Sequence, residues 1–225
     1  MPTHLITGAG SGIGAALADV LHARGDDLVL VARSEQRAKE LSTRYDGAQT
    51  LVADLADVPS LAALELPDSL DSVVHAAGVV ELGPVAELTA GQWREHLDVN
   101  LIAPAELTRL ALPALRAAHG TVVFVNSGAG LHSNPEWSAY AASKHGLRAL
   151  ADALRAEELG TGVRVTSVFP GRTATPMQAK VHDQEGKEYD EADWIRPETV
   201  ADAIRHVLDL PRDATIPDVT VSPGP

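Results

Sequence analysis

The sequence predicts an α/β fold in which one doubly wound parallel sheet of about seven strands carries helices on both faces. Short apolar runs alternate along the chain with longer helix-like segments, an order typical of βαβ units. The run 28–31 is apolar throughout, as in strands that are buried on both faces. The chain has 225 residues and no internal repeat or linker, so residues 1–225 are expected to form a single domain.

The apolar runs place the strands. The run 28–31 reads Leu-Val-Leu-Val, and the run 121–125 reads Thr-Val-Val-Phe-Val. Each run is bounded by glycine or by polar residues, which marks where a strand begins and ends. The predicted strands, in order, are 3–7, 28–31, 50–53, 72–75, 121–125, 163–169 and 218–222.

Glycine, serine and proline delimit the helices. Gly25 is expected to end the first helix, and Ser34 is a suitable N-cap for the second. Pro104 fits the first turn of a helix, whereas Pro113 is expected to kink that helix. The predicted helices are 12–24, 35–45, 90–99, 104–119, 138–159 (ended by Gly160) and 197–210.

The charge balance argues against two classes of partner. The chain has 18 basic and 31 acidic side chains, for a net charge of −13. Such a protein repels phosphate backbones and anionic lipid headgroups, so neither nucleic acid nor a membrane surface is an expected partner. Residues 1–18 carry no basic region, and glycines interrupt them. No export signal is therefore predicted, and the protein is expected to be cytoplasmic.

The side-chain inventory excludes several chemistries. The chain has no cysteine, which removes disulfides, thiolate metal sites and thiol nucleophiles. Its nine histidines form no HxxxH or HExxH pair, so no metal site is expected. The GxSxG pattern of many serine hydrolases is also missing.

A glycine-rich turn separates the first predicted strand from the first predicted helix. Residues 7–14 read Thr-Gly-Ala-Gly-Ser-Gly-Ile-Gly. Glycine lets a backbone approach a ligand closely, and a helix N-terminus offers free N–H groups to a phosphate. The spacing differs from GxGxxG, and the GK[ST] ending of a P-loop is missing. The turn predicts a dinucleotide site in a Rossmann-type sheet; the alternative is a tight structural turn.

The end of the second predicted strand favours NADP(H) over NAD(H). An NAD site has a carboxylate there, which accepts a hydrogen bond from the ribose 2′-hydroxyl. Here the residues are Arg33 and Ser34, and the first carboxylate is Glu35. An arginine suits a 2′-phosphate through charge-assisted hydrogen bonds, with Ser34 as a further donor. The alternative is that Arg33 is an ordinary solvated side chain.

A tyrosine, a lysine and a serine suggest acid–base chemistry. Tyr140 and Lys144 lie four residues apart, on one face of the predicted helix. A nearby ammonium group favours the phenolate and is expected to lower the pKa of Tyr140. Ser127 follows the fifth predicted strand, at the sheet edge where ligands bind. Without Ser127, the Tyr–Lys pair could be an ordinary helical neighbour pair.

With these motifs in this order, the sequence resembles the short-chain dehydrogenase/reductase family, in its short single-domain branch, over about residues 3–222. Ser127 precedes Tyr140 by thirteen positions, as the family's serine precedes its tyrosine. The resemblance implies that the catalytic residues are Ser127, Tyr140, Lys144 and Asn100. It implies that the cofactor contacts are Gly8, Ser11, Gly12, Ile13, Gly14, Arg33, Ser34, Asp54, Leu55, Ala76, Ala77, Gly78, Tyr140, Lys144, Pro170, Gly171, Thr173 and Thr175.

The resemblance also implies a reaction. Hydride would pass between NADP(H) and a small-molecule carbonyl or secondary alcohol, with Tyr140 exchanging the proton and Ser127 polarising the carbonyl. Lys144 would assist Tyr140 and hold the nicotinamide ribose, and Asn100 would hold a relay water. The rivals are an NAD-dependent alcohol dehydrogenase and a regulator that senses NADP(H) without turnover. An epimerase or dehydratase of the longer branch would need a further C-terminal domain.

Four further expectations concern the surroundings of the site. His75 stands where the family has asparagine, and it is expected to be a buried structural histidine. Residues 176–195 are expected to form a substrate lid, with a solvated surface helix as the alternative, and the acidity of this segment disfavours acidic substrates. Trp137, Met177 and Trp194 are candidate pocket walls, with ordinary packing as the alternative for each. Family members suggest a homodimer or homotetramer formed through about 100–119 and 138–160.

Overall fold

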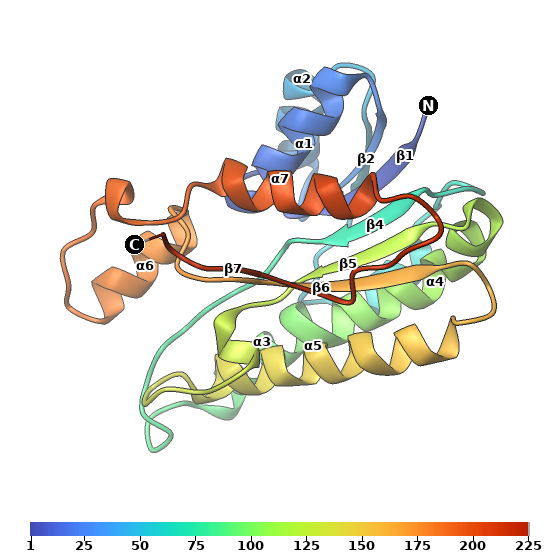
Figure 1. Cartoon of the computed structure of the whole chain (residues 1–225). Coiled ribbons are helices and arrows are strands. Elements are labelled where there is room, and N and C mark those ends of the chain that lie inside the picture. Colours follow the sequence, from blue (N-terminus) through green and yellow to red (C-terminus); the bar gives the residue numbers. More distant parts are fainter. Residues whose placement is uncertain (225) are drawn as a thin grey trace.

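The computed structural model describes residues 1–224. The strands of this part of the chain form one seven-stranded parallel sheet of order β3-β2-β1-β4-β5-β6-β7 (Figure 1). All six pairings between neighbouring strands are parallel. The predicted doubly wound sheet is therefore confirmed. The strands are β1 Thr3–Thr7, β2 Asp27–Ala32, β3 Gln49–Val52, β4 Ser72–His75, β5 Thr121–Val125, β6 Arg164–Pro170 and β7 Asp218–Val221. The helices are α1 Gly12–Arg24, α2 Glu35–Arg44, α3 Ala90–Leu97, α4 Ala103–Ala118, α5 Ser138–Glu157, α6 Pro176–Gln184 and α7 Pro197–Leu208.

Helices cover both faces of the sheet. In Figure 1, α1, α2 and α7 lie on one side, and α3, α4 and α5 lie on the other. Successive side chains of a strand point to opposite faces, so each strand contributes to two separate cores. Ile6 of β1 packs with residues of α1 and α7, while its neighbour Leu5 packs with residues of α4 and α5. This two-sided burial explains why the strand segments are apolar throughout.

Most predicted element ends lie within about two residues of the observed ones. Gly25 ends α1 in the left-handed conformation, at φ 86°, with its N–H bonded to the carbonyl of His22. Ser34 is the N-cap of α2, and its hydroxyl accepts a hydrogen bond from Arg37 N at 3.3 Å. Both predictions from local sequence are therefore confirmed.

The structure differs from the predicted helix plan at two places. α5 ends at Glu157 rather than at Gly160, because the buried carboxylate of Glu158 is held by Arg116 of α4 and by Thr161. Pro113 lies inside α4, which continues to Ala118, and the predicted kink there stays a prediction. A π-helical turn, Asp98–Ile102, joins α3 to α4, where the sequence suggested two separate helices.

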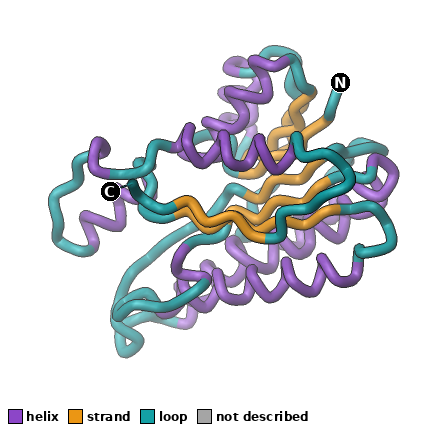
Figure 2. Tube along the Cα trace, viewed as in Figure 1, coloured by secondary structure: helices purple, strands orange, loops and turns teal. Residues whose placement is uncertain are grey.

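The order of the strands gathers several loops at one edge of the sheet. β1 and β4 are neighbours, although two strands separate them in the sequence, so the sheet order reverses between them. Ligands of open α/β sheets bind at this reversal, outside the carboxyl ends of the strands. Figure 2 shows the longest loops at this end of the molecule. Within residues 1–224, no helix is both long enough and apolar enough to cross a bilayer.

His75, the last residue of β4, lies in the core as predicted. It is 2% exposed, its Nε2 lies 2.8 Å from Thr108 Oγ1, and its ring stacks on Phe124 at a centroid distance of 5.0 Å. Burial lowers the pKa of His75 from 6.5 to about 3. The imidazole is therefore neutral in the folded protein at neutral pH.

This burial predicts acid sensitivity. Below pH 6.5 the unfolded chain binds a proton that folded His75 cannot, so the free energy of unfolding falls as the pH drops toward 3. Between pH 7 and pH 5, the free energy of unfolding of the wild type should fall by about 2 kcal/mol more than that of His75→Asn. The variant has no imidazole at this position to bind a proton. Urea unfolding of both proteins at both pH values measures this, and the comparison cancels the titration of His4. Equal losses would contradict the prediction.

Candidate active site

A cleft of about 440 Å³ opens at the carboxyl ends of β1, β4, β5 and β6. It brings together most of the residues predicted for the site, although they come from distant parts of the sequence. The predicted residues that line it are Gly8, Ser11, Gly12, Ile13, Ala76, Ala77, Gly78, Ser127, Tyr140, Lys144, Pro170, Gly171, Thr173 and Thr175. The predicted residues that do not line it are Gly14, Arg33, Ser34, Asp54, Leu55 and Asn100.

The glycine turn after β1 packs tightly against the segment after β4. Gly8 has φ +76°, and a Cβ there would lie 2.7 Å from Ala77 N. A Cβ on Gly14 would collide with the carbonyl oxygen of Gly8. The hydroxyl of Thr7 accepts hydrogen bonds from Ala76 N and Ala77 N, each at 3.2 Å. Glycine is therefore needed at positions 8 and 14, because a larger side chain would collide with the neighbouring backbone.

The N-terminus of α1 is suited to an anion. The Ser11 hydroxyl lines the cleft and makes no capping bond to α1. The first turn of α1 has no acidic side chain. Free N–H groups and the helix dipole at such a terminus favour a phosphate. The turn and the helix end are thus suited to a phosphate group, and the predicted contact to a dinucleotide stays a prediction.

Tyr140 and Ser127 meet inside the cleft. Tyr140 is 6% exposed on α5, and Ser127 has an extended backbone directly after β5. Burial raises the pKa of Tyr140, while the neighbouring Ser127 hydroxyl acts in the opposite direction. The sequence predicted a lowered pKa, but in the structure desolvation of the phenolate outweighs the effect of Ser127.

Lys144 lies one helical turn beyond Tyr140 and is 4% exposed. Its Nζ donates a hydrogen bond to the carbonyl of Val125 at 2.9 Å and lies 5.8 Å from the centroid of the Tyr140 ring. Burial lowers the pKa of Lys144 to about 8. The ammonium is thus held at the floor of the cleft rather than against the phenol oxygen.

Asn100 lies on the π-helical turn and positions the loop that follows β4. Its Oδ1 accepts a hydrogen bond from Val79 N at 2.8 Å, and its Nδ2 donates to the Val79 carbonyl and to Ser143 Oγ, each at 3.0 Å. Asn100 is 1% exposed. Both amide hydrogens are therefore used within the protein. The predicted role in a water relay stays a prediction.

A second group of predicted residues lies outside the cleft, around the start of α2. Arg33 is exposed, and its side chain has no ion pair with any described residue. Sequence reasoning missed Arg37, whose Nη2 lies 3.4 Å from the carbonyl of Gly10 and whose Nη1 pairs with Glu40. Arg37 could have been predicted from its position in the first turn of the helix that Ser34 caps. Two guanidinium groups thus lie near the end of β2.

Asp54 and Leu55 follow β3. The carboxylate of Asp54 is exposed and accepts a hydrogen bond from Ala56 N at 3.0 Å. Leu55 is half-buried against the core beneath α4. The exposed carboxylate leaves an acceptor at this edge of the sheet, and a contact to adenine stays a prediction.

Residues 176–195 cover one side of the cleft. Met177, Gln178 and Val181 of α6 line it. An isolated bridge between Thr173 and Ile195 closes the base of the segment. Thr175, besides lining the cleft, caps α6 by accepting a hydrogen bond from Gln178 N at 3.2 Å.

Two hydrogen bonds to backbone atoms, besides those to the Glu81 side chain, fix α6 over the loop that follows β4. Lys180 Nζ donates to the carbonyl of Val80 at 2.9 Å, and Leu82 N donates to Gln184 Oε1 at 3.2 Å. Of the predicted pocket walls, Trp137 and Met177 line the cleft. Trp194 instead packs against His182 within the segment, with ring centroids 5.0 Å apart.

Known proteins resemble this chain along nearly its whole length. A family profile described as short chain dehydrogenase matches residues 2–186. An uncharacterized oxidoreductase of Staphylococcus epidermidis is 30% identical, over 97% of this chain and 96% of its own. A solved structure of a short chain dehydrogenase/reductase family protein has a TM-score of 0.86 at 31% identity, covering 98% of this chain and 95% of its own.

A further solved structure contains a nicotinamide cofactor derivative. It is an alcohol dehydrogenase from the archaeon Thermococcus sibiricus, complexed with 5-hydroxy-NADP. Its TM-score is 0.82 at 26% identity, and the match covers 98% of this chain and 96% of that one. The order of the sheet agrees with these likenesses. The chain belongs to the short-chain dehydrogenase/reductase family of oxidoreductases.

Proposed function

We propose that this oxidoreductase interconverts a carbonyl compound and a secondary alcohol with NADP(H), and that Tyr140 exchanges the proton. The observation that carries the proposal is the meeting of Ser127, Tyr140 and Lys144 in the cleft that the glycine turn borders. The residues fit the cofactor, because Gly8 and Gly14 leave room for close backbone approach and α1 presents an uncapped N-terminus. When bound, the nicotinamide ring supplies or accepts the hydride.

The protein's own groups manage the proton and orient the substrate. In the direction of reduction, the phenol of Tyr140 donates its proton to the carbonyl oxygen as negative charge develops there. The raised pKa of Tyr140 keeps the phenol protonated at neutral pH. Ser127 holds the same oxygen by a hydrogen bond, and the Lys144 ammonium stabilises the phenolate that remains. Asn100 fixes the Val79 backbone at the rim of the cleft.

The choice of NADP(H) rests on the cations near the end of β2. Arg33 has no carboxylate partner among the described residues, so its guanidinium is available to a 2′-phosphate. Arg37 adds a second positive charge beside Gly10. The complex of the alcohol dehydrogenase with 5-hydroxy-NADP supports the same choice. An NAD-dependent alcohol dehydrogenase remains the rival within the enzyme class.

Residues 176–195 are proposed to act as the lid of this single domain. Their contacts to Val80 and Leu82 close one side of the cleft and would exclude water from it during hydride transfer. The homodimer or homotetramer expected from other family members stays a prediction.

Replacing Tyr140 by phenylalanine tests the function directly. The variant loses only the hydroxyl, so NADPH oxidation with a panel of ketones and aldehydes should fall at least about 100-fold. NADPH binding, followed by its fluorescence, should persist. Tyr45→Phe serves as the matched control and should retain activity, because Tyr45 lies after α2 in the core and does not line the cleft. If the wild type binds NADPH but reduces none of the panel, the protein is a cofactor sensor instead.

Replacing Arg33 by alanine tests the cofactor choice. The KM for NADPH should rise about 10-fold, through the loss of a charge-assisted contact, while the KM for NADH changes little. Arg44→Ala, at the opposite end of α2, is the control. An equal effect on both cofactors, or an equal preference of the wild type for NADH, would contradict the role of Arg33.

Lys144→Met tests the cost of burying the ammonium. The pKa of Lys144 is about 8 in the folded protein, below the ordinary value of 10.5. Between pH 8 and pH 10.5 the unfolded chain therefore binds more protons than the folded protein, and the free energy of unfolding rises with pH. At pH 7 the charged amine costs up to about 3 kcal/mol relative to an unshifted group. In urea unfolding of the cofactor-free proteins, Lys144→Met should therefore gain stability relative to wild type at pH 7, and the gain should shrink by pH 10. A difference that does not vary with pH would refute this.

A further inference from the structure

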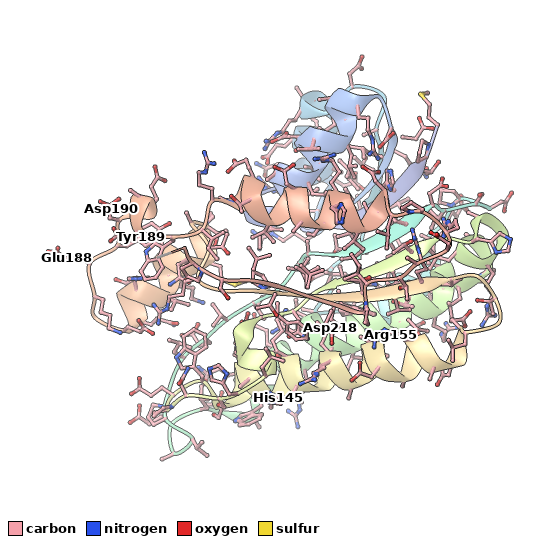
Figure 3. The ribbon with its side chains drawn as sticks, viewed as in Figure 1. His145, Arg155, Glu188, Tyr189, Asp190 and Asp218 are labelled. Atoms are coloured by element: carbon pink, nitrogen blue, oxygen red, sulfur yellow. The ribbon has the colours of Figure 1, made fainter. Side chains whose placement is uncertain are left out.

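The cleft wall is positive in a protein that is strongly acidic. Among the described residues that line it, Arg172 is a cation, Lys144 is an ammonium at neutral pH, and none is aspartate or glutamate. The whole chain has a net charge of −13. Four acidic residues of the 176–195 segment, Glu188, Asp190, Glu191 and Asp193, border a separate hollow. Figure 3 shows Glu188 and Asp190 on the outer edge of this segment, away from the sheet.

Arg172 is held so that its guanidinium has a fixed place. Its Cζ lies 5.9 Å from the centroid of the Trp137 ring and 5.5 Å from that of the Trp194 ring. Both Nη atoms donate to Glu185, at 3.0 and 2.5 Å. The side chain of Glu185 is 11% exposed and does not line the cleft. The two tryptophan rings and the Glu185 carboxylate thus hold the Arg172 guanidinium in place at the wall of the cleft.

Glu185 does not cancel the local positive charge. It also pairs with Lys187 at 3.0 Å. The cluster of Arg172, Lys187 and Glu185 therefore keeps one net positive charge. A guanidinium has five N–H donors, and the two bonds to Glu185 leave three of them for another acceptor.

Arg172 is also close to the proposed reaction centre. Trp137 links them, because its ring centroid lies 5.8 Å from that of Tyr140 as well as 5.9 Å from Arg172 Cζ. The guanidinium and the phenol ring are thus no further apart than the sum of these two distances. A compact molecule of a few carbons spans that gap. Val80, Met177 and Val181 provide apolar contacts for its carbon chain.

On the basis of the proposed function, we propose that the substrate is a short oxo acid, or the matching hydroxy acid, whose carboxylate binds Arg172 while its carbonyl faces Tyr140 and Ser127. A planar guanidinium matches a carboxylate through directed, charge-assisted hydrogen bonds. This assignment reverses the sequence-based expectation that the acidity of the 176–195 segment disfavours acidic substrates. That expectation used the net charge of the segment, whereas the carboxylates lie off the cleft wall.

The kinetic test compares acids with their esters. NADPH oxidation is measured with 4-oxopentanoate and with its methyl ester, which share the carbonyl and differ in charge. In the wild type, kcat/KM should be higher for the acid. In Arg172→Gln, the acid-to-ester ratio of kcat/KM should fall roughly 10- to 100-fold. Arg205→Gln, an exposed arginine on α7, is the matched control and should leave the ratio unchanged.

Further variants separate recognition from folding. Arg172→Gln leaves Glu185 without its main partner, so the double variant with Glu185→Gln removes both charges and should show the same lowered ratio. Glu185→Gln alone frees the guanidinium and should raise the ratio. Arg172→Lys keeps the charge but loses the planar fork, so its ratio should lie between those of the wild type and Arg172→Gln.

A binding measurement separates this proposal from the proposed function. Butanoate, which has no carbonyl to reduce, should change the tryptophan fluorescence of the NADP⁺-saturated protein, whereas butanamide should not. Arg172→Gln should abolish the change. If no carbonyl compound is reduced but butanoate binds through Arg172, the carboxylate site stands and the reductase function falls.

Two results would overturn the carboxylate site. One is Tyr140-dependent reduction of ketones with an acid-to-ester ratio that Arg172→Gln leaves unchanged. The other is a loss of NADPH affinity in Arg172→Gln with an unchanged ratio, because the guanidinium would then serve the phosphates of the cofactor.

Discussion

The close packing of the turn after β1 against the segment after β4 is the constraint on which the site depends. Thr7 holds Ala76 and Ala77 through its hydroxyl, and Gly8 lies so near their backbone that a side chain has no room. This contact exists only because β1 and β4 are neighbours in the sheet. It aligns the N-terminus of α1 with the end of β4, and the ends of β5 and β6 complete the cleft beside them. The sheet order therefore creates a place for a dinucleotide before any catalytic side chain is considered.

Burial shifts the pKa values of the side chains in this cleft, and it lowers the stability of the folded protein. The same desolvation that keeps the phenol of Tyr140 protonated lowers the pKa of Lys144 to about 8. An ammonium held at the Val125 carbonyl is less stable there than in water, and a core built only for stability would have an apolar residue instead. Functional sites commonly retain such unfavourable groups, and the surrounding apolar packing offsets the cost. Two continuous cores, one on each face of the sheet, supply that packing here.

The sequence was informative wherever a local signal determines the structure. Unbroken apolar runs located the strands, Gly25 and Ser34 located helix ends, and the glycine turn and the Ser–Tyr–Lys spacing located the cleft. Local signals failed where a distant contact decides. α5 ends early because Glu158 binds Arg116, which lies 42 residues away in the chain. The π-helical turn that carries Asn100 could not be inferred, because the bonds of Asn100 to Val79 and Ser143 depend on tertiary packing.

The charged side chains show the same difference between what the composition predicts and what the fold decides. The net charge of −13 and the acidic run in residues 183–193 are properties of composition, and composition does not say which way a side chain faces. Folding places Glu188, Asp190, Glu191 and Asp193 around an outer hollow, and among the described residues no carboxylate joins Arg172 and Lys144 at the cleft wall. Charges at a low-dielectric cleft act on a ligand more strongly than solvated charges at a distance, which water and salt screen. The field that a substrate meets in the cleft is therefore set by two cations, and the surface charge of the protein is a poor guide to it.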